Sequence, residues 1–166
     1  MFIQTEMVTM RDGAKMFTVV FKPQAEGKYP IIFVRSPYTP PYEEITEENY
    51  EMLEGMTFGI SLGTTVTLKD TMDAGYCYVL QHGRGTGNSE GIQDHMADDY
   101  NDTNDTLDWI RKQDFYDGEI FMTGSSYLSW NALLMAGDHH KDIKGLVLIV
   151  PNFWHYAISH LYFSTL

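Results

Sequence analysis

The candidate strands of this chain are runs of apolar residues at successive positions rather than at alternating ones. The runs IIFV and LVLIV are the clearest, and such runs are typical of strands covered on both faces, as in a parallel sheet between helices. Strands are predicted over Phe17–Phe21, Ile31–Arg35, Tyr76–Gln81, Ile120–Thr123 and Gly145–Val150. The segment FIQTEMV near the start predicts an additional edge strand.

Segments with helical periodicity lie between several of these predicted strands. Asp94–Lys112 is predicted to be a helix, because its large and apolar residues recur at the helical period. These residues are Met96, Tyr100, Leu107 and Ile110, with Thr103 at the remaining step. Asp98, Asp99 and Asp105 fall elsewhere on this helix and are expected mostly to face solvent.

Two further helices are predicted, over Ser126–Gly137 with Gly137 as its terminator and over Thr46–Gly55 in an acidic segment. The alternation of strands and helices predicts one open α/β domain, with a mostly parallel sheet and helices on both faces. Ligands bind such sheets at the carboxyl ends of the strands. The loops SPYTPP, HGRGTGNSEG and TGSSYLS are therefore the candidate sites.

Composition and charge exclude several functions. No apolar run reaches the length of about 18 residues that a membrane span needs, and the start, MFIQTEMVTMRDG, does not read as a signal peptide. The only cysteine, Cys77, lies in an apolar run and cannot form an internal disulfide, which indicates a buried thiol and a cytoplasmic protein. The formal net charge is −12 and the basic residues are scattered, so nucleic acid is not an expected partner.

The stretch MTGSSYLSW contains the candidate nucleophile. A strand runs directly into a helix through Gly124, Ser125 and Ser126, and a serine on such a sharp turn exposes its hydroxyl above the sheet. The amide of Tyr127, at the start of the helix, would point toward an oxyanion. The alternative is that Ser125 or Ser126 is an ordinary N-cap, and the hexapeptide GSSYLS alone favours it.

The other two loops carry weaker signals. Tyr38, in RSPYTPP, could donate its hydroxyl to an oxyanion, since hydrolases of this topology take a second donor from a loop after an earlier strand. Taken alone, packing beside a proline turn explains Tyr38 better. The loop HGRGTGNSEG lacks G-x-G-x-x-G and G-K-[ST], so nucleotide binding is discounted. Arg84 is expected to organise this loop by bonding carbonyls or a carboxylate such as Glu90.

Several segments match one family pattern in order and spacing. They are MVTMRDGAKMFTVVFKP, GKYPIIFVRSPY, GYCYVLQHGRGTGNSEG, DTLDWIRKQDFYDGEIFMTGSSYLSW and IKGLVLIVP. Together they resemble the cocaine esterase / Xaa-Pro dipeptidyl-peptidase (CocE/NonD-type) family of α/β-hydrolases. The resemblance implies that Ser126 is the acyl-accepting nucleophile, that the Tyr127 amide and the Tyr38 hydroxyl form the oxyanion hole, and that no metal or organic cofactor takes part.

The chain departs from the family pattern at three places. Ser129 replaces the last glycine of G-x-S-Y-x-G, a change between small residues that is expected to keep the helix packing. His82 replaces the aspartate of Q-D-x-R-G and is interpreted as a histidine that structures its loop. The segment Thr39–Asp70 is longer and more acidic than the usual connection.

A serine nucleophile needs a histidine base oriented by a carboxylate, and in α/β-hydrolases both follow the serine in the chain. The candidates after Ser126 are Asp138, Asp142, His139, His140, His155 and His160. Asp138, His139 and His140 are expected at the far end of the elbow helix, and His155 and His160 are interpreted as partly buried helix residues. The acid and base are therefore expected to lie outside this chain.

The sequence thus predicts the N-terminal part of a catalytic domain over 1–150 and the start of an incomplete helical cap over 151–166. The predicted function is hydrolysis of small-molecule esters, amides or peptides through Ser126, with a remaining C-terminal portion or a homo-oligomer as possible partners. The chain alone is expected to be inactive and to expose a sheet edge. The alternative is a catalytically inactive hydrolase-like module for binding or assembly.

Overall fold

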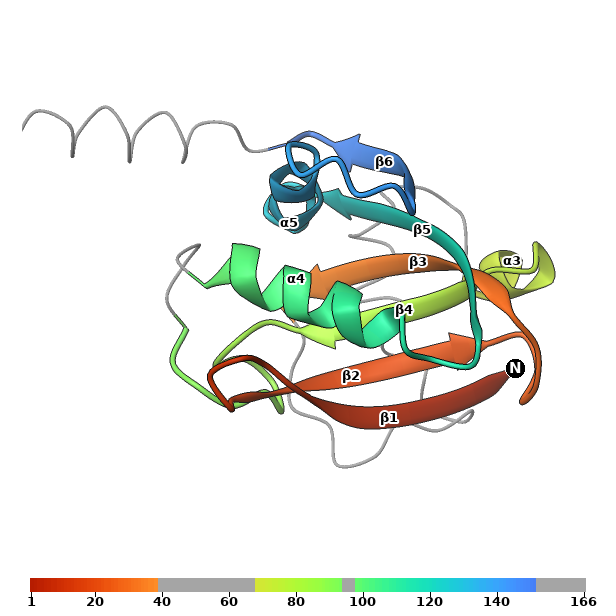
Figure 1. Cartoon of the computed structure of the whole chain (residues 1–166), viewed down its shortest axis with the longest axis horizontal. Coiled ribbons are helices and arrows are strands. Elements are labelled where there is room, and N and C mark those ends of the chain that lie inside the picture. The colour runs from red at the N-terminus through yellow and green to blue at the C-terminus, as the bar shows by residue number, and fades with distance from the viewer. Residues whose placement is uncertain (39–67, 94–97, 152–166) are drawn as a thin grey trace, which may run out of the picture.

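The computed structural model describes residues 1–38, 68–93 and 98–151 (Figure 1). Its strands are β1 (Phe2–Thr9), β2 (Lys15–Lys22), β3 (Tyr29–Ser36), β4 (Cys77–His82), β5 (Tyr116–Ser125) and β6 (Ile143–Ile149). Its helices are α3 (Leu68–Asp73), α4 (Asp99–Ile110) and α5 (Leu128–Met135). All six predicted strands are therefore confirmed, with small shifts at their ends.

The strands form one sheet in the order β1-β2-β4-β3-β5-β6. β4, β3, β5 and β6 pair in parallel, whereas β1 and β2 add an antiparallel hairpin at one edge. The parallel strands all end on the same side of the molecule, so the first residues after β3, β4 and β5 lie on that side (Figure 1). The expected mostly parallel α/β sheet is confirmed.

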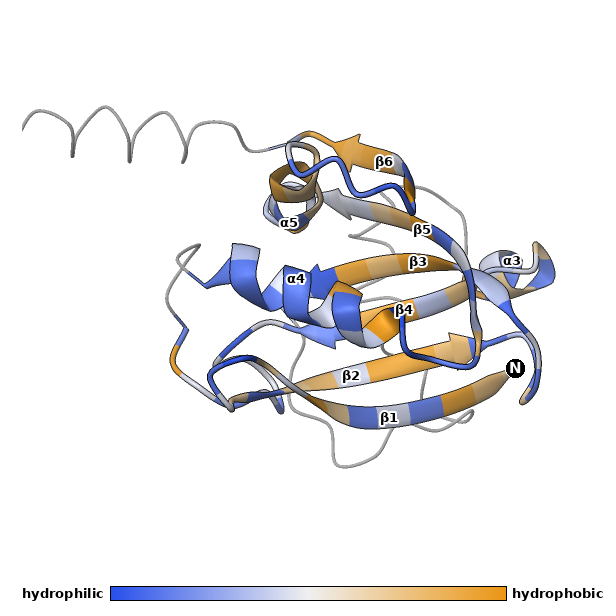
Figure 2. Cartoon of the chain, viewed as in Figure 1, coloured by the Kyte–Doolittle hydropathy of each residue, from blue (hydrophilic) through white to orange (hydrophobic). Residues whose placement is uncertain are grey.

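Both faces of the sheet carry a hydrophobic core. Neighbouring residues on one strand alternate between the two cores: Val34 packs with Leu68 and Met72 of α3, whereas Phe33 packs on the other face with Leu107 of α4 and other residues. Figure 2 shows the hydrophobic residues gathered on the central strands and on α5, while α4 is mostly hydrophilic. Helices therefore cover both faces, as the successive apolar runs predicted.

The helices differ from the prediction in several details. α4 has Leu107, Ile110 and Thr103 buried, but Tyr100, expected on the apolar face, is exposed. The side chains of Asp99 and Asp105, expected toward solvent, are only 13% and 14% exposed, because arginines and a tyrosine draw them inward. α3 was not predicted. The predicted helix over Thr46–Gly55 lies outside the described residues.

Two features bear on earlier expectations about the surface and the thiol. Cys77 is fully buried, and burial raises the pKa of its thiol to about 12. β6 forms one edge of the described sheet, where Val147 is 54% exposed and Val150, just beyond the strand, is 78% exposed.

None of the helices in the described ranges is long and apolar enough to cross a lipid bilayer. The segment predicted to begin a cap lies outside the described residues from residue 152 onward.

Candidate functional site

The candidate nucleophile lies on a sharp turn between β5 and α5. Ser126 follows the last residue of β5, has a positive φ of 54° and is exposed. A positive φ is uncommon for a residue with a side chain, so surrounding contacts must maintain it. Gly124 is one reason for the tight turn, because a Cβ there would lie 2.5 Å from the carbonyl oxygen of Leu128.

Hydrogen bonds hold the backbone of Ser126 on both sides. Its amide donates to the carbonyl of Ile149 at the end of β6 (2.9 Å). Its carbonyl accepts from the amide of Ser129 (3.2 Å) and from the Ser129 hydroxyl (2.5 Å). Ser129, which stands in place of the family's last glycine, is fully buried. Its hydroxyl adds a hydrogen bond between α5 and the turn at Ser126.

The N-cap alternative for the two serines is wrong in this structure. Tyr127 occupies the N-cap position of α5, and no side chain caps this end of the helix. Neither Ser125 nor Ser126 is therefore explained by capping.

At its other end, the helix stops at Met135, two residues before Gly137, whose backbone is not left-handed.

Tyr127 and Tyr38 lie next to each other beside the elbow. Their ring centroids are 6.4 Å apart, with the rings edge to face. Tyr38 is 52% exposed, and its amide donates to the hydroxyl of Ser36 at the end of β3 (3.2 Å). The Tyr127 hydroxyl donates to the carboxylate of Asp99 at the start of α4 (2.9 Å), and burial together with the charge of Asp99 raises the pKa of Tyr127. The structure thus places Ser126, Tyr127 and Tyr38 at the carboxyl ends of the parallel strands.

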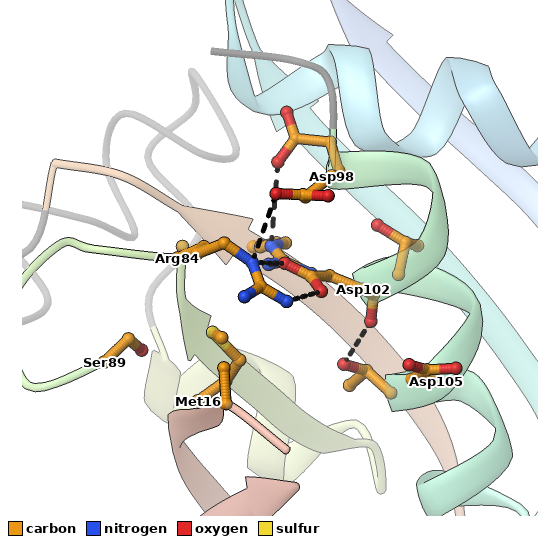
Figure 3. Close-up of polar contacts among 12 residues, drawn as sticks. Met16, Arg84, Ser89, Asp98, Asp102 and Asp105 are labelled. Carbon is orange, nitrogen blue, oxygen red and sulfur yellow. Dashed lines mark hydrogen bonds and ion pairs between the residues drawn. The ribbon is translucent and has the colours of Figure 1, made fainter. Parts of the chain in front are cut away.

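A buried ionic network lies below these tyrosines. Arg35, at the end of β3, donates to Asp102 of α4 (2.6 Å), and their side chains are 1% and 2% exposed. Arg84 donates to both oxygens of Asp102 (2.6 and 3.0 Å) and pairs with Asp98 (3.7 Å), as Figure 3 shows. Asp102 therefore binds two arginines from two neighbouring strand ends.

Arg84 binds carboxylates, as the sequence predicted, but Glu90, the carboxylate named as an example, is not the partner. Besides Asp102 and Asp98, Arg84 donates to Asp12 in the β1–β2 turn (2.7 Å), not to the carboxylate of Glu90. Glu90 instead accepts from the amide of Lys15 (3.0 Å). The loop after β4 is thus fixed to the hairpin by Glu90 and to α4 by Arg84.

His82 has the environment of a structural residue. Its side chain is fully buried, its ring centroid lies 4.9 Å from that of Phe17, and its Nδ1 accepts from the amide of Asn88 (3.2 Å). Burial lowers the pKa of His82 to about 4, which keeps the ring neutral at pH 7. These contacts agree with the interpretation of His82 as a loop-structuring histidine.

The described acids and histidines that follow α5 are separated from Ser126 by the length of a helix or a strand. Asp138, His139 and His140 come after the carboxyl end of α5, whereas Ser126 precedes its amino end. Asp142 lies before β6, whose opposite end reaches Ser126. His155 and His160 lie outside the described residues. In the described ranges, no cluster of three or more histidine, cysteine, aspartate or glutamate side chains could hold a metal ion.

Asp142 gives a testable pH dependence. It accepts from Arg111 (2.7 and 2.9 Å) and Tyr116 (2.9 Å), and the Arg111 guanidinium is the main reason that its pKa falls to about 2. The unfolded chain has an Asp pKa of about 3.9, so Asp142 stabilises the fold above pH ~4 and loses this contribution as the pH falls toward 2. Urea unfolding at several pH values should show that Asp142→Asn is destabilising at neutral pH and that its difference from wild type shrinks below pH ~4. A difference that stayed constant down to pH 2 would contradict this assignment.

Sequence reasoning missed the acidic residues that support the site. Asp99 was expected to face solvent and Asp102 was not singled out, yet Asp99 contacts Tyr127 and Asp102 contacts Arg35. One signal was available: an arginine at the end of a strand covered on both faces needs a buried counter-charge. Asp99 and Asp102 are also three residues apart, so they share a helix face.

Comparisons with known proteins identify relatives along most of the chain. The sequence model of the X-Pro dipeptidyl-peptidase (S15) family matches residues 12–164. Cocaine esterase from Rhodococcus sp. (strain MB1 Bresler) is 34% identical over 149 residues, which cover 88% of this chain and 22% of that protein.

Solved structures show the same fold. An α-amino acid ester hydrolase matches with a TM-score of 0.66 and 26% identity, over 87% of this chain and 24% of its own. Est1E from Butyrivibrio proteoclasticus, solved with ferulic acid, matches with a TM-score of 0.69 over 94% of this chain and 56% of its own; at 18% identity that likeness shows the fold alone. The chain spans about a quarter of the length of the esterase and of the amino acid ester hydrolase.

Proposed function

Because this chain belongs to the X-Pro dipeptidyl-peptidase (S15) family of hydrolases and has the α/β-hydrolase fold, we propose that it is the nucleophile-bearing portion of a serine hydrolase. Its substrates are small-molecule esters, amides or peptides. The observation that carries the proposal is the backbone of Ser126: an exposed serine with a positive φ, on a turn that Gly124 keeps tight. Such a turn presents a serine hydroxyl to a substrate carbonyl.

In the proposed reaction, the Ser126 oxygen attacks the substrate carbonyl while a base takes the hydroxyl proton. The amide of Tyr127 and the hydroxyl of Tyr38 stabilise the oxyanion that forms, and the two rings already lie beside each other at this edge. The alcohol or amine departs with a proton from the protonated base. Water then attacks the acyl-enzyme, which releases the acid and restores Ser126.

The catalytic acid and base, in this proposal, lie outside the described residues. His82 is fully buried against Phe17, and Asp138, His139 and His140 follow the end of α5 that is away from Ser126. The remaining members of the triad would come from another portion of the full-length protein or from a second copy. We therefore expect residues 1–166 alone to hydrolyse no simple ester; turnover that depends on Ser126 in this piece would contradict this part of the proposal.

Labelling with a fluorophosphonate probe tests the nucleophile. In the full-length protein, Ser126→Ala should abolish labelling, because the probe forms a covalent bond only with an activated serine hydroxyl. Ser125→Ala is the matched control: it removes the neighbouring hydroxyl at the end of β5 and should be labelled like wild type. Equal labelling of Ser126→Ala and wild type would overturn the assignment. A folded wild-type protein that takes up no probe would instead favour the inactive binding module.

A further inference from the structure

We propose that Asp99 is a positioning residue that orients both donors of the oxyanion hole through the side chain of Tyr127. The inference rests on the proposed function, since it concerns the same oxyanion hole. Tyr127 supplies one donor by its backbone amide, and its ring contacts Tyr38, whose hydroxyl is the other donor. Whatever fixes the Tyr127 side chain therefore acts on both.

The contact that fixes it is the hydrogen bond from the Tyr127 hydroxyl to Asp99 Oδ2 (2.9 Å). Asp99 is the first residue of α4, a different element from the elbow, and its side chain is only 13% exposed. Bonds from a hydroxyl to a carboxylate are stronger than those between neutral groups, and limited access to water strengthens them further. The bond thus ties the first residue after the nucleophile to the helix beside it.

Asp99 differs in its partner from the other acids of this segment. Asp98 pairs with Arg84, Asp102 binds Arg84 and Arg35, and Asp105 binds Arg11. Only Asp99, among these four carboxylates, accepts from a residue of the elbow.

Arg35 supports this role of Asp99. Burial raises the pKa of Asp99, and the Arg35 guanidinium, whose Nε lies 3.9 Å from Asp99 Oδ1, opposes this shift and favours the carboxylate form that accepts from Tyr127. Arg35 is in turn held by Asp102 (2.6 Å). Asp99, Arg35, Arg84, Tyr127 and Asn131 line one small pocket between the ends of β3 and β4 and the helices α4 and α5.

The consequence for the reaction is specific. The hydrogen bond to Asp99 restricts movement of the Tyr127 side chain. Because the side chain and the backbone of one residue move together, the bond also restricts the orientation of the Tyr127 amide. An oxyanion donor acts on the transition state more than on the bound substrate, and a misplacement of about 1 Å can cost about 100-fold in rate. Loss of the tether should therefore lower kcat and leave KM nearly unchanged.

Three variants of the full-length protein test the tether. Tyr127→Phe removes only the donor hydroxyl, Asp99→Ala removes the acceptor, and Asp99→Asn keeps an acceptor oxygen while removing the charge. With a p-nitrophenyl ester as substrate, Tyr127→Phe and Asp99→Ala should each lower kcat by about 10-fold to 100-fold. Asp99→Asn should retain kcat within about 3-fold, and KM should change less than about 3-fold in all three.

The double variant Asp99→Ala/Tyr127→Phe should be no slower than the slower single variant, because both substitutions break the same bond. Asp105→Asn is the matched control, since Asp105 lies on the same helix with a similar exposure but binds Arg11; its kcat should equal that of wild type. If Asp99→Ala fails to fold, Tyr127→Phe alone decides.

A wild-type kcat in Tyr127→Phe would overturn the inference, as would additive losses in the double variant. This failure is distinguishable from failure of the proposed function. In the first case Ser126→Ala still abolishes fluorophosphonate labelling while Tyr127→Phe reacts normally. In the second case Ser126→Ala is labelled like wild type, whatever the Asp99 variants do.

Discussion

Replacing Asp102 with alanine is expected to lower the free energy of unfolding by about 3–5 kcal/mol, the range typical for breaking one side of a buried ion pair. Asp102 accepts from Arg35 and from Arg84, and the side chain of Arg35 is only 1% exposed. Without the Asp102 carboxylate, the buried Arg35 guanidinium keeps only the longer ion pair with Asp99 (3.9 Å) among the described residues. Urea unfolding of the full-length protein, followed by tryptophan fluorescence, would measure the loss.

Asp105→Ala serves as the control for this prediction. Asp105 lies three residues further along α4, but its partner Arg11 has a side chain that is 56% exposed. Water can therefore replace the carboxylate, and the loss should be far smaller than that of Asp102→Ala. Equal losses of unfolding free energy in the two variants would show that burial of the Arg35–Asp102 pair does not increase its contribution to stability.

Gly124→Ala is expected to cost about 3 kcal/mol and to abolish fluorophosphonate labelling of Ser126. The new Cβ would lie 2.5 Å from the carbonyl oxygen of Leu128 and would also contact its side chain. Overpacking of this kind typically costs about 1–3 kcal/mol, and here the obstacle is backbone in the first turn of α5. The helix must shift, and Ser126 and Tyr127 must shift with it.

Gly137→Ala is the matched control, because a Cβ at Gly137 would have no atom within 4 Å and its φ is not in the left-handed region. This variant should be as stable as wild type or slightly more stable. Thermal unfolding and the rate of labelling check both variants. Normal labelling in a folded Gly124→Ala protein would mean that the tight turn is not required for reactivity at Ser126.

The strands were predictable because residues of a strand that is buried on both faces of the sheet are apolar at successive positions. The run IIFV alternates between the two cores once folded, so Phe33 and Val34 point to opposite faces. The turn at Ser126 was expected from the family resemblance, since the hexapeptide GSSYLS alone favoured an ordinary N-cap.

The support of the site was not predictable in the same way. The periodicity of α4 sorts residues into apolar and polar, so Asp99 was assigned to the polar side and Asp102 was not singled out. Their burial depends on Arg35, which lies 67 residues before Asp102 in the chain. Hydropathy patterns carry no record of such long-range charge pairing. The exposure of Tyr100 has the same origin, since the acids of α4 take the inward positions.

The hydrogen bond from the Ser126 amide to Ile149 couples the candidate nucleophile to the outermost strand of the described sheet. An outermost strand has only one neighbour to restrain it, so its fluctuations pass directly to the turn that carries the hydroxyl. A further strand or a second chain that pairs with β6 would restrain this motion. Assembly at that edge would then steady the turn that carries the candidate nucleophile, with no contact to the substrate.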